Sequence, residues 1–176
     1  MASTYDFTGH TIAVTGAGKG IGRATVVSLY QSNAAKTIAI TRTQSDLDTL
    51  IKETNSDGRI VPVCLDLSNQ NFMPVLEKLF KEHNVNMLVN NAGTGGLASF
   101  EEMTEENYDR IMQVNLKSAT FVAQVFAKNF KSTSGSIVNV SSQAAFVPLP
   151  LHGVEKRLVL QEIKCINKIV NKQNSG

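Results

Sequence analysis

The amino-acid sequence predicts a doubly wound α/β fold of the Rossmann type, in which helices cover both faces of a parallel sheet. Short apolar runs alternate with longer helix-like segments along most of the chain. Each run is apolar throughout rather than alternating, which is typical of a strand buried on both faces. The first run leads through a cluster of glycines directly into a helix. We therefore expect about five strands in the order 3-2-1-4-5.

The composition is that of one ordinary globular domain without a strong charge bias. The chain has 176 residues, of which 42% are hydrophobic and 18% charged, and its formal net charge is +2. So small a charge argues against binding to nucleic acid or to an acidic membrane surface. The sequence has no apolar run of transmembrane length and no signal-peptide pattern, so we expect a cytoplasmic protein. Cys64 and Cys165 lack metal-ligand spacing, so we expect no metal site.

Each expected element has a local signal that places it. The expected strands are the apolar runs at residues 11–15, 37–41, 60–65, 87–91 and 136–141. The expected helices lie over residues 21–32, 46–54, 71–83 and 105–130, and the last is long enough to form one rod or two pieces. Ser45 is expected to cap the second helix and Thr104 to begin the last, because hydroxyl side chains accept hydrogen bonds from helix N–H groups.

Residues 15–22, with the sequence TGAGKGIG, form the candidate phosphate-binding turn. Glycines let the backbone turn tightly and approach a pyrophosphate, and the helix start offers unpaired N–H groups and a positive dipole end. Turns also use glycine for steric reasons alone. Because a strand precedes this turn and a helix follows it, we predict nucleotide binding here. The predicted binding residues are Gly16, Gly18, Lys19, Gly20, Ile21 and Gly22.

A second signal concerns which dinucleotide would fit. In a dinucleotide site, an acidic residue near the end of the second strand usually binds the ribose 2′-hydroxyl. Here that place is taken by Thr41, followed by Arg42 and Thr43, and Lys19 lies within the glycine turn. Cations and hydroxyls suit a 2′-phosphate, which favours NADP over NAD. The alternative is that Lys19 and Arg42 are ordinary surface cations.

Other polar residues near the strand ends each allow two interpretations. Asp66 suits an acceptor for an adenine amino group or a turn carboxylate. Asn90 and Asn91 suit hydrogen bonds that tie their strand to its neighbours. Asn115 is unusual inside a helix and indicates either a kink near the site or a polar helix face. The serine pair that ends at Ser142 could offer a hydroxyl to a substrate carbonyl or simply form a turn.

Taken together, these motifs resemble those of a known family. The combination of TGxxxGxG at residues 15–22, Asp66, NNAG at residues 90–93, Asn115 and Ser142 resembles the short-chain dehydrogenase/reductases. The resemblance covers about residues 7–152. It implies an oxidoreductase that reduces carbonyl compounds, such as sugars and α-dicarbonyls, with NADPH.

The resemblance also implies a role for each site residue. Lys19, Arg42 and Thr43 would hold the 2′-phosphate and Asp66 the adenine. Ser142 would bind the substrate carbonyl and Asn115 would hold a water in the proton relay. The remaining residues along the cofactor would be Asn90, Ala92 and Gly93.

The sequence departs from the family at two catalytic positions. Family members carry a Tyr thirteen residues after the catalytic Ser, and a Lys four residues further on. The Tyr phenol gives a proton to the carbonyl, and the Lys lowers the phenol pKa and holds the nicotinamide ribose. Counting from Ser142 gives Glu155 and Val159, and no tyrosine follows Tyr108. We therefore expect this chain to be inactive or only weakly active.

The resemblance ends abruptly after His152, which is typical of a truncated isoform with an unrelated tail. We therefore divide the chain into an NADP-binding domain over residues 1–152 and a tail over residues 153–176 that could form an amphipathic helix. The sheet would lack the last two strands of the family. Pairing into a dimer, if it occurs, would use the helix around 105–130. Besides an active reductase, two alternatives remain: a chain that binds NADP without turnover, alone or paired with a full-length subunit, and an unstable isoform without a molecular function.

Overall fold

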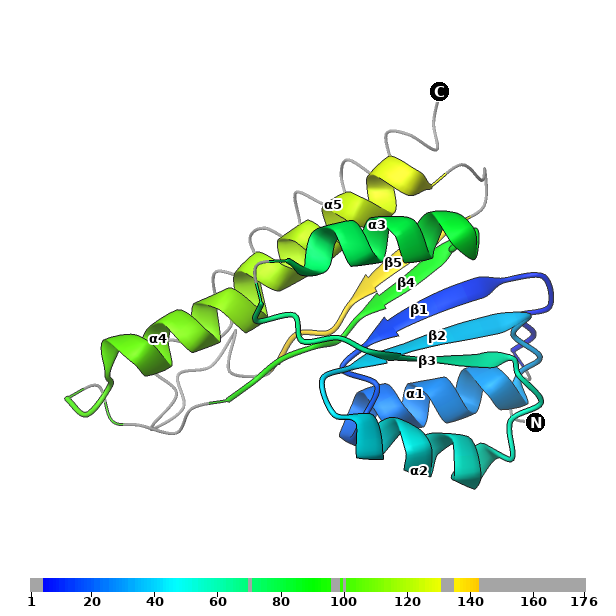
Figure 1. The fold of residues 1–176 in the computed structure, drawn as a ribbon, viewed down its shortest axis with the longest axis horizontal. Helices are drawn as coiled ribbons and strands as arrows, with labels where there is room; N and C mark the ends of the chain where they lie inside the picture. Colours follow the sequence, from blue (N-terminus) through cyan, green and yellow to red (C-terminus); the bar gives the residue numbers. More distant parts are fainter. Residues whose placement is uncertain (1–4, 70, 96–98, 100, 131–134, 143–176) are drawn as a thin grey trace.

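The computed structural model describes residues 5–69, 71–95, 99, 101–130 and 135–142. Its centre is a parallel sheet with the strand order β3-β2-β1-β4-β5 (Figure 1). The strands are β1 (Thr11–Thr15), β2 (Lys36–Thr41), β3 (Ile60–Cys64), β4 (Met87–Asn90) and β5 (Ser136–Asn139). The predicted strand order is confirmed.

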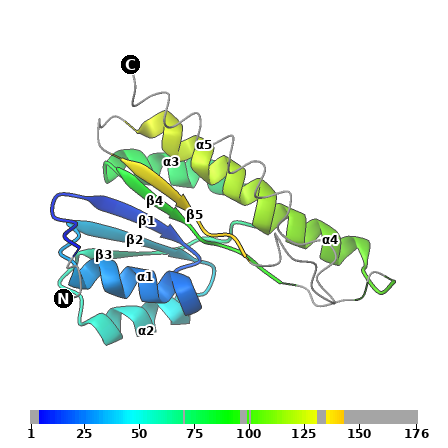
Figure 2. The same ribbon diagram turned by 180° about the vertical axis from the view of Figure 1, so that it is seen from behind.

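Helices cover both faces of this sheet, as the doubly wound class requires. One face carries α1 (Gly20–Gln31) and α2 (Gln44–Thr54), and the other carries α3 (Phe72–Glu82) and α5 (Ala119–Asn129) (Figures 1 and 2). Helix α4 (Glu105–Met112) and the π-helical segment η1 (Gln113–Ser118) precede α5 without a break. The predicted α/β class is confirmed.

Two apolar cores lie on the two faces of the central strands. Successive side chains of a strand point to opposite faces, so Ile12 and Val14 pack toward α1 and α2, whereas Ala13 packs toward α3 and α5. All three are almost completely buried. Burying one large aliphatic side chain stabilises a fold by about 1.5–3 kcal/mol, so these two cores hold the central strands in place between the helices.

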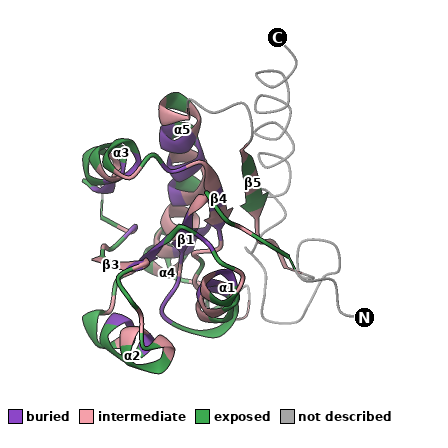
Figure 3. Cartoon of the chain, turned by 90° about the vertical axis from the view of Figure 1, so that its right-hand side faces the viewer, coloured by how far each residue is buried: buried purple, intermediate pink, exposed green. Residues whose placement is uncertain are grey.

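The outer strands differ from the sequence prediction. We predicted strands buried on both faces, which holds for β1 and β2 but not for β3 and β5, whose residues alternate between more and less exposed. Val138 of β5 is 53% exposed. Figure 3 shows β5 coloured as exposed and intermediate rather than buried. The reason is that an outer strand of the described sheet has a neighbour on one side only, so the helices cover it less completely.

The helix starts confirm one predicted cap and correct the other. Thr104 caps α4, where its Oγ1 accepts a hydrogen bond from the Asn107 N–H at 3.2 Å. Ser45, by contrast, is not a cap. Helix α2 begins at Gln44, so Thr43 is the cap residue and Ser45 already lies inside the first turn. The Thr43 side chain makes no cap hydrogen bond.

Asn115 marks an irregularity in the long helix. It lies within η1, where the helix widens between α4 and α5, and its side chain is only 6% exposed. A π-helical segment is frequently found at a functional site. Of the two interpretations of Asn115, the structure therefore favours a local irregularity and excludes a solvent-facing polar stripe.

Candidate nucleotide-binding site

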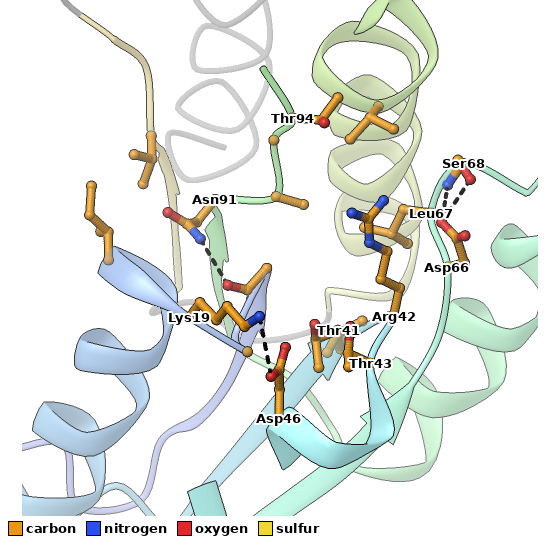
Figure 4. Close-up of a pocket in the computed structure, with 18 of the residues that line it drawn as sticks. Lys19, Thr41, Arg42, Thr43, Asp46, Asp66, Leu67, Ser68, Asn91 and Thr94 are labelled. Carbon is orange, nitrogen blue, oxygen red and sulfur yellow. Dashed lines mark hydrogen bonds and ion pairs between the residues drawn. The ribbon is translucent and has the colours of Figure 1, made fainter. Parts of the chain in front are cut away.

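A cleft of about 550 Å³ lies at the carboxyl ends of the strands (Figure 4). Its walls come from the glycine turn, the start of α2, the segment after β3, the loop after β4 and the end of β5. Of the predicted site residues, those that line it are Gly16, Gly18, Lys19, Ile21, Arg42, Thr43, Asp66, Ala92, Gly93 and Ser142. The other four do not line it: Gly22, Asn90 and Asn115 are buried behind the lining, whereas Gly20 is exposed.

The glycine turn needs glycines for two different reasons. Gly16 and Gly20 have φ values of +68° and +53°, in the left-handed region that side chains disfavour. Gly22 has an ordinary φ, but a Cβ there would collide with the carbonyl oxygen of Gly16. The turn is thus folded tightly on itself, with no side chain between its backbone and the cleft at these positions.

The N-terminus of α1 meets the chemical requirements of an anion site. Lys19 is its cap residue, makes no side-chain cap hydrogen bond and has an extended backbone. The first turn contains no acidic residue. The first N–H groups of a helix lack internal partners, and the helix dipole places partial positive charge beside them. A phosphate group would therefore fit this helix start.

Arg23 braces the glycine turn against α2. Its Nη1 donates to the carbonyl oxygens of Gly18 at 3.2 Å and of Asp46 at 3.0 Å. Its Nε donates to Glu53 at 2.8 Å, within an ion pair. One guanidinium thus links α1, the turn and the start of α2. Sequence reasoning did not single out Arg23, because an arginine one residue after a glycine motif gives no signal of such a contact.

Asn91 fixes the turn from the other side. Its Nδ2 donates to the carbonyl oxygens of Thr15 at 3.0 Å and Gly16 at 3.3 Å. The Thr15 hydroxyl in turn accepts from the N–H groups of Asn91 and Ala92, both at 3.0 Å. These bonds join the ends of β1 and β4, which confirms the prediction that this asparagine ties neighbouring strands together.

Asn90, one residue before Asn91, is buried and also joins neighbouring elements by hydrogen bonds. Its Nδ2 donates to the Ala119 carbonyl oxygen at 2.8 Å and to Asn139 Oδ1 at 3.1 Å, while its Oδ1 accepts from the Thr15 hydroxyl at 3.4 Å. It therefore joins β1, β4, β5 and the start of α5. Its place behind the lining assigns it a scaffold function in this structure.

Asn115 holds the loop after β4. Its Oδ1 accepts from the Thr94 N–H at 2.7 Å, and its Nδ2 donates to the Thr94 carbonyl oxygen at 2.8 Å. Arg110 adds a hydrogen bond from its Nη1 to the Thr94 hydroxyl at 2.6 Å. Thr94 lines the cleft, so both side chains position one of its walls.

The end of β2 brings charged groups to one part of the cleft. Arg42 is exposed and points into the cleft, and Thr43 lies next to it (Figure 4). The ammonium of Lys19 lies across from them, 3.7 Å from a carboxylate oxygen of Asp46. The sequence analysis placed Asp46 only at the start of the second expected helix. It lines the cleft because α2 packs beside the glycine turn.

Asp66 lies in the cleft wall formed by the segment after β3, where its side chain closes a turn. Its Oδ1 accepts hydrogen bonds from the Ser68 N–H at 2.9 Å and from the Ser68 hydroxyl at 2.8 Å. The turn interpretation of Asp66 is therefore confirmed. Because the carboxylate also lines the cleft, an additional function toward an adenine remains a prediction.

Ser142 and Ser141 line the cleft where β5 ends. Thr41 and Asn91, both named from the sequence, also line the cleft. Other lining residues that sequence reasoning did not name come from several elements, and their residue types carry no motif: Ile40, Leu65, Leu67, Ser68, Thr94, Gly95, Val114 and Val140. Within the described part of the chain, no group of His, Cys, Asp and Glu side chains could hold a metal ion, and no helix has both the length and the apolar character to cross a membrane.

Residues 10–154 match the family model of the short chain dehydrogenases. The chain belongs to the short-chain dehydrogenase family. The matched range contains the glycine turn and every wall of the cleft described above. The resemblance on which the sequence interpretation rested is thereby confirmed at the level of the family.

Family members with similar sequences include reductases of sugars. An L-xylulose reductase of Caenorhabditis elegans is 38% identical over 99% of this chain and 71% of its own length. The human L-xylulose reductase is 40% identical over 83% of this chain and 58% of its own length. The matches thus span 58% to 71% of the length of these relatives.

The solved structures of the family agree with the fold. A short-chain dehydrogenase from Sphingobium yanoikuyae in complex with NADPH superimposes with a TM-score of 0.82, at 25% identity, over 93% of this chain and 66% of that one. The positions of Glu155 and Val159, and the whole tail of residues 153–176, lie outside the described residues.

Proposed function

We propose that the cleft binds NADP(H) and that the chain carries the carbonyl-reducing chemistry of the L-xylulose reductases that it is similar to. The observation that carries the proposal is that the uncapped start of α1 and the cations Lys19 and Arg42 line a single cleft. A helix start suits a pyrophosphate, and separate cations beyond it suit a further phosphate.

The preference for NADP over NAD rests on the end of β2. The position that often carries an acidic residue for the ribose 2′-hydroxyl is Thr41, and Arg42 and Thr43 follow it in the cleft. Arginine binds phosphate with a planar pair of donors, and it stays charged at all physiological pH values. The family member from Sphingobium yanoikuyae, solved with NADPH, gives support from a related fold.

The residues of the cleft have separate tasks in this proposal. The bound cofactor supplies the hydride that reduces a carbonyl carbon. The glycine turn and the start of α1 bind its pyrophosphate, while Ala92 and Gly93 line its path. The Ser142 hydroxyl, at the end of β5, donates a hydrogen bond to the carbonyl oxygen of the substrate. Asn115 keeps the wall at Thr94 in place.

The slow step in the proposed chemistry is the transfer of a proton to the carbonyl oxygen. Reduction of a carbonyl requires a positioned acid, and one such acid accelerates a reaction by about 10²–10⁴-fold. At the spacing where the family has its Tyr and Lys, this sequence has Glu155 and Val159. A glutamate is ionised at neutral pH, and valine has no group that could lower a pKa or bind a ribose. We therefore propose turnover that is slow at best.

The same observation favours a second candidate function, in which the chain binds NADP(H) without turnover. The two candidates share the cleft and differ only in the reaction. Single-turnover assays with L-xylulose or a small α-dicarbonyl, followed by NADPH absorbance, separate them. Oxidation of NADPH that depends on the carbonyl supports a reductase, and binding without oxidation supports the second candidate.

A titration of the purified chain with NADPH tests the binding proposal common to both. The matched variants are Lys19→Gln, at the cleft, and Lys36→Gln, at the opposite end of β2. Each removes one lysine charge. We expect Lys19→Gln to weaken NADPH binding several-fold and Lys36→Gln to leave it unchanged. No binding to the unaltered chain, or equal effects of both variants, would contradict the proposal.

A further inference from the structure

The carboxylate of Asp46 occupies an unusual place for a cleft expected to bind a 2′-phosphate. It comes from the first turn of α2 and lines the cleft beside Thr41 and Thr43 (Figure 4). The Asp46 Oδ2 and the Thr41 hydroxyl oxygen both lie 2.8 Å from the point where a Cβ on Gly18 would stand. The carboxylate therefore reaches the glycine turn itself.

The Asp46 side chain is largely removed from water but poorly partnered. It is 17% exposed, and its partner is the Lys19 ammonium at 3.7 Å, which is 82% exposed. Among the described residues, no hydrogen-bond donor reaches this carboxylate. A carboxylate has several acceptor positions, and this half-buried one leaves them open to a donor from a ligand or from water.

These observations point to the kind of group that suits the carboxylate. A ribose 2′-hydroxyl is a donor and would satisfy it, whereas a 2′-phosphate carries only acceptors and brings negative charge toward negative charge. Lys19 favours a 2′-phosphate over a 2′-hydroxyl. While its ammonium is paired with Asp46, the carboxylate partly cancels the positive charge that a phosphate would meet. The two side chains therefore favour different dinucleotides from the same position.

We propose that Asp46 is a specificity-determining residue that weakens NADP(H) binding and permits NAD(H) to bind in the same cleft. This inference rests on the proposed function, because it concerns how the adenosine end of the bound cofactor is selected. The acid expected at the end of β2 is thus supplied by α2, five residues after Thr41 in the sequence. Lys19 favours the phosphate, and Asp46 limits how strongly that preference is expressed.

The test compares dissociation constants for NADPH and NADH in the unaltered chain, Asp46→Asn and the control Asp48→Asn. Asp48 lies on the same helix but is exposed and accepts from Gln44 at 2.9 Å, away from the cleft lining. We expect Asp46→Asn to raise the preference for NADPH over NADH by about tenfold, from tighter NADPH and weaker NADH binding. Asp48→Asn should leave the preference unchanged.

Two further measurements keep the test decisive. Adenosine 2′,5′-bisphosphate and 5′-AMP probe the adenosine end alone, and the first should gain affinity in Asp46→Asn while the second should not. Lys19→Met, at a largely exposed side chain, should shift the preference toward NADH because Asp46 remains. This variant also compares NADPH with NADH binding, but it leaves α2 unaltered.

The outcomes separate this inference from the proposed function. If the unaltered chain binds neither dinucleotide, the proposed function fails. If it binds NADPH but Asp46→Asn changes only the melting temperature and not the preference, Asp46 is merely a helix-start acid and the inference is wrong. Equal changes in affinity for adenosine 2′,5′-bisphosphate and 5′-AMP in Asp46→Asn would also overturn it.

Discussion

Asn115 and Thr94 are joined by a reciprocal pair of hydrogen bonds, in which one amide side chain satisfies both backbone groups of a loop residue. Asn115 lies in the π-helical segment between α4 and α5. The irregularity in the helix thus coincides with the contact that holds this wall of the cleft. A regular helix with a different residue at this position would leave the Thr94 backbone without these partners.

Replacing Asn115 should loosen this wall. Asn115→Asp keeps an acceptor for the Thr94 N–H but loses the donor, and it places a charge against the Thr94 carbonyl oxygen. We expect a loss of about 1–3 kcal/mol in the free energy of unfolding, together with weaker NADPH binding. Asn129→Asp, which removes a hydrogen bond to Val125 at the far end of α5, is the control. It should lower stability without changing NADPH affinity, and equal affinity in both variants would contradict the account.

The brace formed by Arg23 gives a second prediction. Arg23→Gln removes the bonds to the Gly18 and Asp46 carbonyl oxygens, so the glycine turn should no longer be held in place against α2. We expect NADPH affinity to fall about tenfold. Glu53→Gln removes only the ion pair at the exposed end of Arg23, which is worth less than about 1 kcal/mol. Isothermal titration calorimetry compares the two, and a larger effect in Glu53→Gln would show that the brace is not what holds the turn.

The two glycine requirements in the turn predict different costs. Gly22→Ala forces a methyl group against the Gly16 carbonyl oxygen, so the backbone of the turn must shift, at a cost of about 1–3 kcal/mol. Gly20→Ala meets no neighbouring atom within 4 Å and suffers only from its positive φ, at a cost of about 1 kcal/mol. Denaturant unfolding measures both. The account would be wrong about the close approach at Gly22 if its variant were the more stable of the two.

Placing a Tyr and a Lys at the spacings that the family uses tests the proposed chemistry. In Glu155→Tyr/Val159→Lys, we expect the rate of carbonyl-dependent NADPH oxidation to rise by about 10²–10⁴-fold, because a positioned phenol replaces an ionised carboxylate as the acid. The single variant Val159→Lys serves as the control and should gain much less. A double variant that binds NADPH with unchanged affinity and remains inactive would show that the defect is not confined to these two positions.

The sequence was sufficient for the fold and for most of the cleft. Continuous apolar runs placed all five described strands, because burial on two faces excludes polar residues from the central ones. It was less informative at the edges, where β3 and β5 are half exposed, and at the start of α2, where several hydroxyl residues compete for the cap. Asp46 and Arg23 could not be assigned in advance, because their significance lies in contacts between α1 and α2 that no local pattern encodes.

Pairing through the helix around 105–130 stays a prediction, as does the division of the chain at residue 152. Residues 153–176 lie outside the described residues. Size measurement by light scattering at several protein concentrations would show whether the chain pairs.

A thermal melt of the purified chain with and without NADPH and NADH tests the central claim, that this chain folds into a domain with a working NADP(H) cleft. A ligand that binds only the folded state at one hundred times its dissociation constant adds about 2.7 kcal/mol to stability. We predict a cooperative transition that NADPH moves upward by several degrees and NADH moves less. A chain without a cooperative transition, or one that neither dinucleotide stabilises, would contradict the account.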